Sequence, residues 1–144
     1  MTWIVIEPET PLQFALSRIG DRWSLLIIDA LQAGSLLFSD LSERVQGIAP
    51  NTLSSRLTRL EADGVLMADP YSERPVRFEY RLTAAGRDLA GALRLLAHWG
   101  DRFAEESAGI RHDLCGTPLE PRWFCPSCDR VVTDIDAQVE IRSV

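Results

Sequence analysis

The sequence predicts a mainly α fold of the α+β kind, with one small sheet. Two short stretches with helical spacing of apolar residues, 39–45 and 50–62, are joined by a turn that contains Gly47. Two β-prone stretches follow, 65–69 and 77–82, and a long helix with an apolar stripe comes next. This order is that of a winged helix-turn-helix, here followed by a small C-terminal β-ribbon appendage.

The chain is long enough for one domain with a buried core and an appendage. Of its 144 residues, 46% are hydrophobic and 25% charged, as in soluble globular proteins. Beyond Gly109 the composition shifts to Pro, Cys and acids, so we expect a first domain at 1–108 and an extension at 109–144. No apolar run reaches the roughly 18 residues that cross a bilayer, and no basic leader is present. We expect a cytoplasmic protein without membrane contact.

Two apolar helices are expected before the helix-turn-helix. The first begins at Leu12 and ends at Gly20, and the second is capped by Asp21 and stops at Gly34. The second is the expected core helix, and its buried face is predicted to hold Trp23, Leu26, Ile27, Ala30 and Leu31. A short β-prone run, residues 3–7, precedes both helices.

The helix-turn-helix has a start signal for each of its helices. Ser39 is expected to cap the first, which continues through Val45. Pro50 opens the second, because a missing N–H costs little at the first helical position, and Gly64 ends it. The second helix has one narrow stripe of leucines that we expect to be buried, formed by Leu53, Leu57 and Leu60. Its opposite face carries Asn, Ser, Thr and Arg and no acid before Glu61.

The two strands after the helix-turn-helix predict a wing. The first strand is expected to end at Pro70, and the loop to the second holds two prolines and two arginines. The second strand alternates, and the residues expected to face inward are Phe78, Tyr80 and Leu82. Thr83 is then expected to cap one long helix that continues to residue 107.

Several motifs, in this order along the chain, carry a resemblance to a known family. They are IGDRWSLLIIDAL, FSDLSERVQGIAPNTLSSRLTRLEADGVL, VRFEYRLTAAGRDL and LAHWG. Together, over about residues 12–103, they resemble the HxlR family of bacterial winged-helix transcription regulators. The resemblance implies a homodimer that binds operator DNA, with the N-terminal helix and the long dimerisation helix packed across the two-fold axis. Many members carry a cysteine just before the first helix, but this chain has Glu9 to Leu12 there, so N-terminal thiol sensing is not implied.

The distribution of charge is compatible with DNA binding, although the net charge of -6 is not typical of it. Residues 50–100 hold seven arginines and six acids, whereas both flanking segments are acidic. Major-groove base edges accept short hydroxyl and amide groups and bidentate arginine, so the expected base contacts are Asn51, Thr52, Ser55 and Arg59. The expected phosphate contacts are Ser54 and Arg56 on the helix and Arg74 and Arg77 on the wing. The alternative is that these side chains only solvate a helix face and a hairpin end.

The C-terminal extension contains a possible set of metal ligands. His112, Cys115, Cys125 and Cys128 have the spacing H-x2-C-x9-C-x2-C, and three cysteines do not suit a disulfide framework. A tetrahedral Cys3His site would hold structural zinc, although Asp129 stands where a second knuckle would prefer glycine. The alternative is a β-ribbon with free or transiently paired thiols. Residues 122–125 and 130–135 are expected strands, and residues 137–142 a third that pairs with residues 3–7.

Enzymatic activity is not expected. The chain has neither a glycine-rich phosphate loop nor a G-x-S-x-G motif, and His98 suits a packing or dimer contact better than a general base. The function predicted is therefore a homodimeric, sequence-specific transcriptional regulator that binds double-stranded operator DNA, with an unknown effector. Two rival functions are a winged-helix protein-interaction module and a small-molecule sensor. In the sensor, Trp23 and Trp99 would line an effector pocket, but core packing is the simpler role for both.

Overall fold

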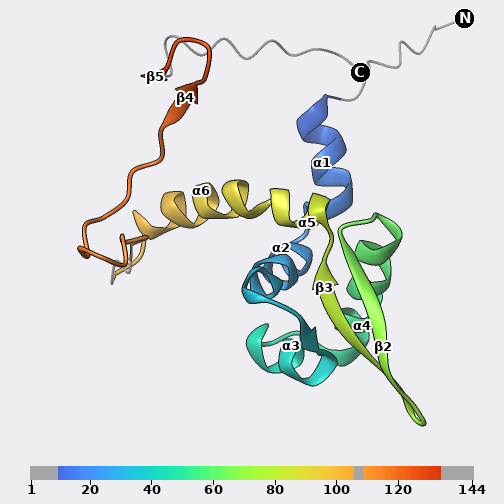
Figure 1. Ribbon diagram of the computed structural model, residues 1–144. Coiled ribbons are helices and arrows are strands. Elements are labelled where there is room, and N and C mark those ends of the chain that lie inside the picture. Colours follow the sequence, from blue (N-terminus) through green and yellow to red (C-terminus); the bar gives the residue numbers. More distant parts are fainter. Residues whose placement is uncertain (1–9, 106–108, 134–144) are drawn as a thin grey trace, which may run out of the picture. The chain divides into compact units, whose positions relative to one another are not determined.

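The computed structural model describes residues 10–105 and 109–133 (Figure 1). Contacts within the chain divide it into two units, one at residues 12–93 and the other at residues 1–11 and 94–144. The first unit holds the helix-turn-helix, its sheet and a hydrophobic core, and the second holds the small β-ribbon. The predicted winged helix-turn-helix is confirmed.

The helix before the core, α1, spans Pro11–Ile19, and the core helix α2 spans Arg22–Ala30. The predicted cap of α2 is confirmed, since the Asp21 carboxylate accepts the backbone N–H groups of Trp23 and Ser24 at 3.1 and 3.0 Å. A 3-10 turn, η1, spans Leu31–Ala33 and leads to the left-handed Gly34. The prediction for Leu26 was wrong: its side chain is 41% exposed, because the buried side of α2 is centred on Ser24, Ile27 and Ile28.

A two-residue strand, β1, spans Leu36–Leu37 and leads directly into α3, which spans Phe38–Arg44. The predicted cap at Ser39 was wrong, because the helix begins at Phe38 and its N-cap is Leu37, two residues before the predicted one. The N–H of Leu37, the residue just before the helix, donates to the Asp40 carboxylate at 3.1 Å. The second helix of the pair, α4, spans Pro50–Ala62 and has Pro50 at its first position, as predicted.

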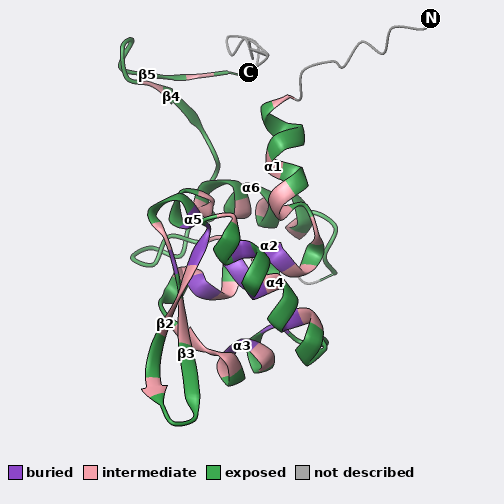
Figure 2. Cartoon of the chain, turned by 90° about the vertical axis from the view of Figure 1, so that its right-hand side faces the viewer, coloured by how far each residue is buried: buried purple, intermediate pink, exposed green. Residues whose placement is uncertain are grey.

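One hydrophobic core holds the first unit together. The leucine stripe of α4 is fully covered and packs in the same cluster as Ile27 and Ile28 of α2 and Leu41 of α3. Figure 2 shows the buried residues on α2 and α4 together with the exposed outer side of α4. Beyond α4, Gly64 takes a φ of 71°, which a side chain would strain, and so ends the helix as predicted.

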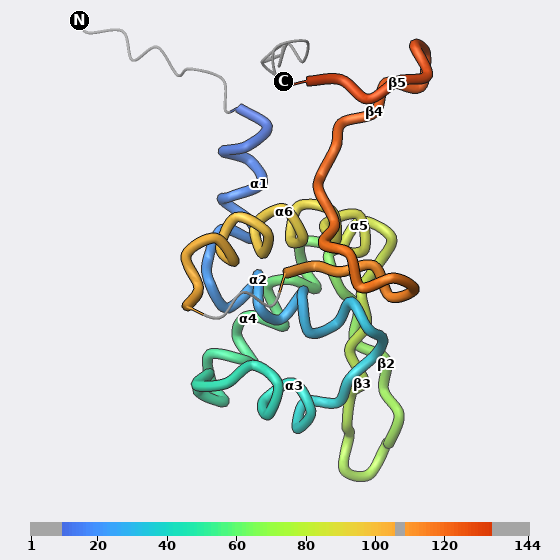
Figure 3. The backbone as a smooth tube through the Cα atoms, turned by 90° about the vertical axis from the view of Figure 1, so that its left-hand side faces the viewer, coloured from blue at the N-terminus to red at the C-terminus, as the bar shows by residue number. Residues whose placement is uncertain are grey.

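The sheet of the first unit has the strand order β1-β3-β2 and is antiparallel. β2 spans Leu66–Glu73 and β3 spans Val76–Leu82, and their hairpin projects beyond the helices of this unit (Figure 3). The predicted end of β2 at Pro70 was wrong. β2 is an edge strand, where a missing N–H is tolerated, and a bulge between Pro70 and Ser72 lets pairing continue to the tip.

The alternation predicted for β3 is only partly correct. Leu82 is buried and Tyr80 is half-buried, but Phe78 is 40% exposed because the hairpin has left the core at that point. After β3, Thr83 caps a helix by accepting the N–H of Gly86 at 3.2 Å, as predicted.

The expected single long helix is two helices. α5 spans Ala84–Asp88 and α6 spans Ala90–Asp101, so the second also ends earlier than predicted. At the break, the Leu89 N–H turns to the Gly86 carbonyl, three residues back, at 3.3 Å, which is the tighter spacing of a 3-10 turn.

The β-ribbon of the second unit consists of β4, Trp123–Cys125, and β5, Arg130–Val132, paired antiparallel. Both strands were predicted. The proposed strand at residues 137–142 and its partner at 3–7 lie outside the described residues. Among the helices that are described, none is long and apolar enough to cross a membrane.

The close contact of Gly86 predicts a stability difference between two glycines. A Cβ at Gly86 would lie 2.1 Å from the Val65 carbonyl oxygen, whereas one at Gly91 would meet no atom within 4 Å. Gly86→Ala should therefore lower the free energy of unfolding by about 1–3 kcal/mol through overpacking. Gly91→Ala, the control, should leave it unchanged or raise it by up to about 1 kcal/mol. Urea unfolding followed by circular dichroism measures both, and equal stability of the two variants would contradict the packing described.

Candidate nucleic-acid interface

The outer face of α4 is a polar surface opposite the buried leucines. Asn51, Ser54 and Ser55 are exposed and Thr52 is half-buried. Within the described part of the chain, the side chains of these four residues form no hydrogen bond or ion pair. The next residue on this face, Thr58, instead donates its hydroxyl to the Ser54 carbonyl at 3.1 Å. The N-terminal half of α4 thus offers unengaged amide and hydroxyl groups to an external partner.

Both arginines predicted as DNA contacts on α4 are held by groups of their own chain. The Arg56 Nε lies 3.2 Å from Asp21 Oδ1, and the Arg56 side chain is only 29% exposed. Arg59 donates to the Ser17 carbonyl at the end of α1, and its Nε lies 3.9 Å from Asp63 Oδ2. The Arg59 side chain is still 49% exposed. Sequence reasoning missed Ser17 and Asp21 as partners because both are far from α4 along the chain, whereas Asp63 lies only four residues after Arg59.

Asp21 keeps its charge at physiological pH. Partial burial by itself would raise the pKa of this carboxyl, but hydrogen bonds from the Ser24 hydroxyl and N–H, together with the Arg56 guanidinium, lower its pKa below 3.8. The same carboxylate therefore caps α2 and holds Arg56 of α4. Arg56 therefore has a structural partner, and this ion pair connects the middle of α4 to the start of α2.

The acidic side chains near the C-terminal end of α4 bind groups of their own chain. Asp63 Oδ1 accepts from Arg18 Nη1 of α1 at 2.8 Å, and its side chain is mostly covered. Glu61 accepts the backbone N–H of Ala68 at 3.2 Å. Both carboxylates lie at the C-terminal end of α4, so the N-terminal half, which carries the polar surface, has no negative side chain.

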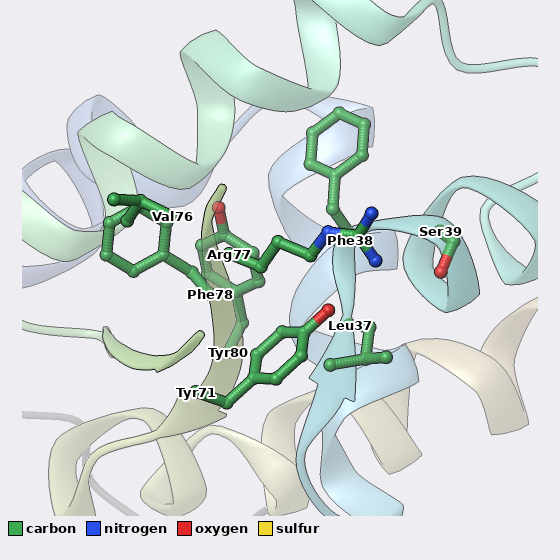
Figure 4. A pocket seen from close by; sticks show the side chains of 8 residues that line it. All are labelled: Leu37, Phe38, Ser39, Tyr71, Val76, Arg77, Phe78 and Tyr80. Carbon is green, nitrogen blue, oxygen red and sulfur yellow. The ribbon is translucent and has the colours of Figure 1, made fainter. Parts of the chain in front are cut away.

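The wing carries two exposed arginines. Arg74 lies in the tip and Arg77 near the start of β3. Arg77 also lines a pocket of about 350 Å³ between the hairpin and the start of α3. In Figure 4 its side chain extends from β3 toward Phe38 and Ser39. The other lining residues are Leu37, Tyr71, Val76, Phe78 and Tyr80.

A third arginine of the hairpin is already paired. Arg81 Nε lies 2.6 Å from Asp69 Oδ2 across the two strands, at the end of the hairpin nearer the core. On the hairpin, the arginines that remain for a partner are therefore Arg74 and Arg77, at the outer end of the wing. In Tyr80, which faces the pocket, burial and the nearby Glu61 carboxylate raise the pKa, so its hydroxyl stays protonated.

Two helices outside the polar surface expose apolar side chains. On α1, Leu12 and Leu16 are exposed one turn apart. On and just after α6, Leu96, Trp99 and Phe103 follow helical spacing; Trp99 is 57% exposed and its ring centroid lies 4.9 Å from that of Phe103. A core role for Trp99 was therefore wrong for the single chain, whereas Trp23 does pack against the core.

The four predicted metal ligands occur as two separate pairs. His112 Nδ1 lies 3.3 Å from Cys115 Sγ, and the Cys125 and Cys128 side chains are in contact at the turn between β4 and β5. In residues 10–105 and 109–133, no three His, Cys, Asp or Glu side chains gather in a way that could hold a metal ion. The structure brings each pair together but does not bring the four ligands together.

Comparison with known proteins places the fold among transcription factors. A family model described as HxlR-like helix-turn-helix matches residues 18–108. An HTH-type transcriptional regulator of Mycobacterium tuberculosis is 42% identical over 123 residues, which cover 83% of this chain and 77% of that protein. A solved putative transcription factor of Pseudomonas aeruginosa is 32% identical, with a TM-score of 0.70 and 90% of each chain covered. A solved regulator from Enterococcus faecalis, titled as of the MarR family, is 34% identical, with a TM-score of 0.58 over 73% of this chain and 96% of that one.

The two roles of Asp21 can be separated by substitution. Asp21→Ala removes both the cap and the ion pair and should destabilise the protein by about 1–2 kcal/mol. Asp21→Asn keeps a capping oxygen but removes the charge, so it should cost less, about 1 kcal/mol or below. Because the pKa of Asp21 is lowered on folding, the advantage of wild type over Asp21→Asn is present above pH 3.8 and is lost as the pH falls further.

Urea unfolding of wild type and both variants at neutral pH and near pH 3 measures these differences. A wild-type advantage over Asp21→Asn that persists unchanged in acid would show that the charge of Asp21 does not hold Arg56.

Proposed function

Because the chain belongs to the HxlR-like helix-turn-helix family and is a transcriptional regulator, we propose that it reads a specific DNA sequence as a homodimer. The observation that carries this proposal is the outer face of α4, where Asn51, Thr52 and Ser55 are accessible and form no bonds to described residues of their own chain. Amide and hydroxyl groups are suited to base edges in the major groove, and recognition helices use mainly their N-terminal residues for this contact.

Two arginines of the wing would supply the electrostatic attraction to the phosphates of DNA. Arg74 and Arg77 are exposed at the outer end of the wing, where a hairpin reaches phosphates or the minor groove. Ser54, on the edge of the α4 surface, suits a phosphate oxygen. Arg56 is paired with Asp21, so its part is to fix the orientation of α4 more than to bind phosphate directly.

Arg59 can contact a base while it keeps its bond to α1. Its half-exposed guanidinium has five donors, and one bond to the Ser17 carbonyl leaves others for a guanine edge. Since the bond to α1 fixes the side chain before DNA arrives, less rotamer entropy is lost on binding.

Dimerisation supplies the affinity that a single subunit lacks. The exposed apolar faces of α1 and α6 need cover, and single soluble subunits rarely leave such patches in water. A second copy packed on them makes a two-fold assembly. Its two α4 helices would then reach successive major grooves about 34 Å apart.

Alanine substitutions should separate base contact from phosphate contact. Asn51→Ala and Ser55→Ala should lower the affinity for the selected operator by about 1–3 kcal/mol and relax base preference at one position each. Arg77→Ala should weaken binding to all duplexes and reduce the slope of log K against log salt by about 1. Arg102→Ala, which removes an exposed arginine beyond α6, is the charge-matched control and should bind like wild type.

The measurement is a gel shift on the duplex obtained by selection from a random pool and on a scrambled duplex. Equal affinity of wild type for the two duplexes at every salt concentration would refute sequence-specific regulation. Absence of any salt-dependent binding would favour the protein-interaction module instead.

Trp99→Asp tests the dimer. A carboxylate in the middle of the proposed contact should convert the dimer to monomers and weaken operator binding, while the circular dichroism of the monomer stays native because Trp99 is exposed in the single chain. Leu114→Asp, at another exposed apolar residue, is the control and should remain dimeric. Sedimentation velocity gives the masses, and a wild type that binds its operator as a monomer would overturn the assembly.

A further inference from the structure

Each ligand pair of the C-terminal extension lies in a tight turn between two antiparallel segments. In the first turn the His112 carbonyl accepts the N–H of Gly116 at 2.7 Å and of Cys115 at 3.3 Å. Bonds from Leu119 N–H to the Ile110 carbonyl at 2.7 Å, and a bridge between Arg111 and Pro118, close the segment below the turn. The turn holds His112 Nδ1 and Cys115 Sγ 3.3 Å apart, on the same side.

The second turn connects β4 to β5 and has the hydrogen bonds of a metal knuckle. The Cys125 sulfur accepts the backbone N–H groups of Cys128 and Ser127 and contacts the Cys128 thiol. The turn therefore places both sulfurs side by side, where they can ligate one ion.

Both turns share one unusual backbone position. The residue after the second ligand has a left-handed φ in each case, 69° at Gly116 and 50° at Asp129. Asp129 is the only non-glycine residue with positive φ in the described parts of the chain. The absence of glycine at this position was an objection from sequence to a second knuckle. Aspartate is one of the few residues that adopt this conformation readily, so the objection does not hold.

We propose that the two turns are the halves of one tetrahedral zinc site with the ligands His112, Cys115, Cys125 and Cys128. Each half already holds two ligand atoms on one side, and three sulfurs with one imidazole form an ordinary closed zinc set. All four protein ligands fill the coordination sphere, so the site is structural and leaves no position for catalysis.

Binding must close the two halves on each other, because the described structure holds them as separate pairs. The linker of nine residues between Cys115 and Cys125 has its midpoint at Glu120, next to Pro121. Residues 120–122 belong to no helix or strand and lie outside the bond between Leu119 and Ile110, so a reversal there breaks no ladder. Such a reversal would place Cys115 opposite Cys125, since each lies five residues from Glu120. Zinc sites of this size form together with their metal, since the ion provides the energy that orders the loop.

Metal content of the untagged full-length chain tests the site. Wild type, purified and dialysed against a weak chelator, should retain about one zinc per chain. Cys115→Ser, Cys125→Ser and His112→Ala should each retain much less, because each removes one of the four ligands. Ser127→Ala is the matched control, since it lies in the same turn but offers no ligand, and it should bind like wild type.

Cobalt substitution gives a second readout. Wild type should show thiolate-to-cobalt charge transfer and the strong visible bands of tetrahedral cobalt, and Cys115→Ser should weaken the charge transfer. Three results would overturn the site: no retained metal and no thiolate band, metal that survives Cys115→Ser, or a Cys125–Cys128 disulfide found by mass in protein purified with reductant-free buffer. Metal content does not depend on DNA binding, so this test stands apart from that of the operator.

Discussion

Burial of one narrow leucine stripe decides what the rest of α4 can do. Leu53, Leu57 and Leu60 are almost fully covered, and each buried leucine side chain contributes on the order of 1.5–3 kcal/mol of transfer free energy. A rotation of α4 about its axis would expose this stripe, so the helix has one orientation. The polar residues on its far side therefore face outward because of a packing constraint, before any partner is considered.

Charged contacts refine the position that the leucines set. Asp21 connects the start of α2 to Arg56 in the middle of α4, and Arg18 connects α1 to Asp63 at the C-terminal end of α4. Exposed ion pairs of this kind contribute little to stability. Their value here is geometric, since they hold the middle and the C-terminal end of the helix whose accessible half carries Asn51 and Ser55.

The parts of the fold with local signals could be predicted from sequence. Pro50, the Asp21 and Thr83 caps and the leucine spacing act within one helical turn, so the winged helix-turn-helix followed from them. The exposure of Leu26 and Phe78 could not, because it depends on which element lies across from each side chain. The start of α3 was missed although its signal is local: Asp40, three residues after Leu37, accepts the Leu37 N–H, and Ser39 lies inside the helix.

The bond from Arg59 to the Ser17 carbonyl makes the two ends of the proposed function depend on each other. α1 carries the apolar face that we propose for contact with a second subunit, and its last turn also holds Arg59 of the proposed recognition helix. A shift of α1 that releases this bond changes the rotamers open to Arg59, and by thermodynamic reciprocity an operator that binds the Ser17-bonded Arg59, as proposed, would hold α1 in place. In the proposed assembly, a change in the subunit contact at α1 would thus alter operator affinity without approaching the duplex.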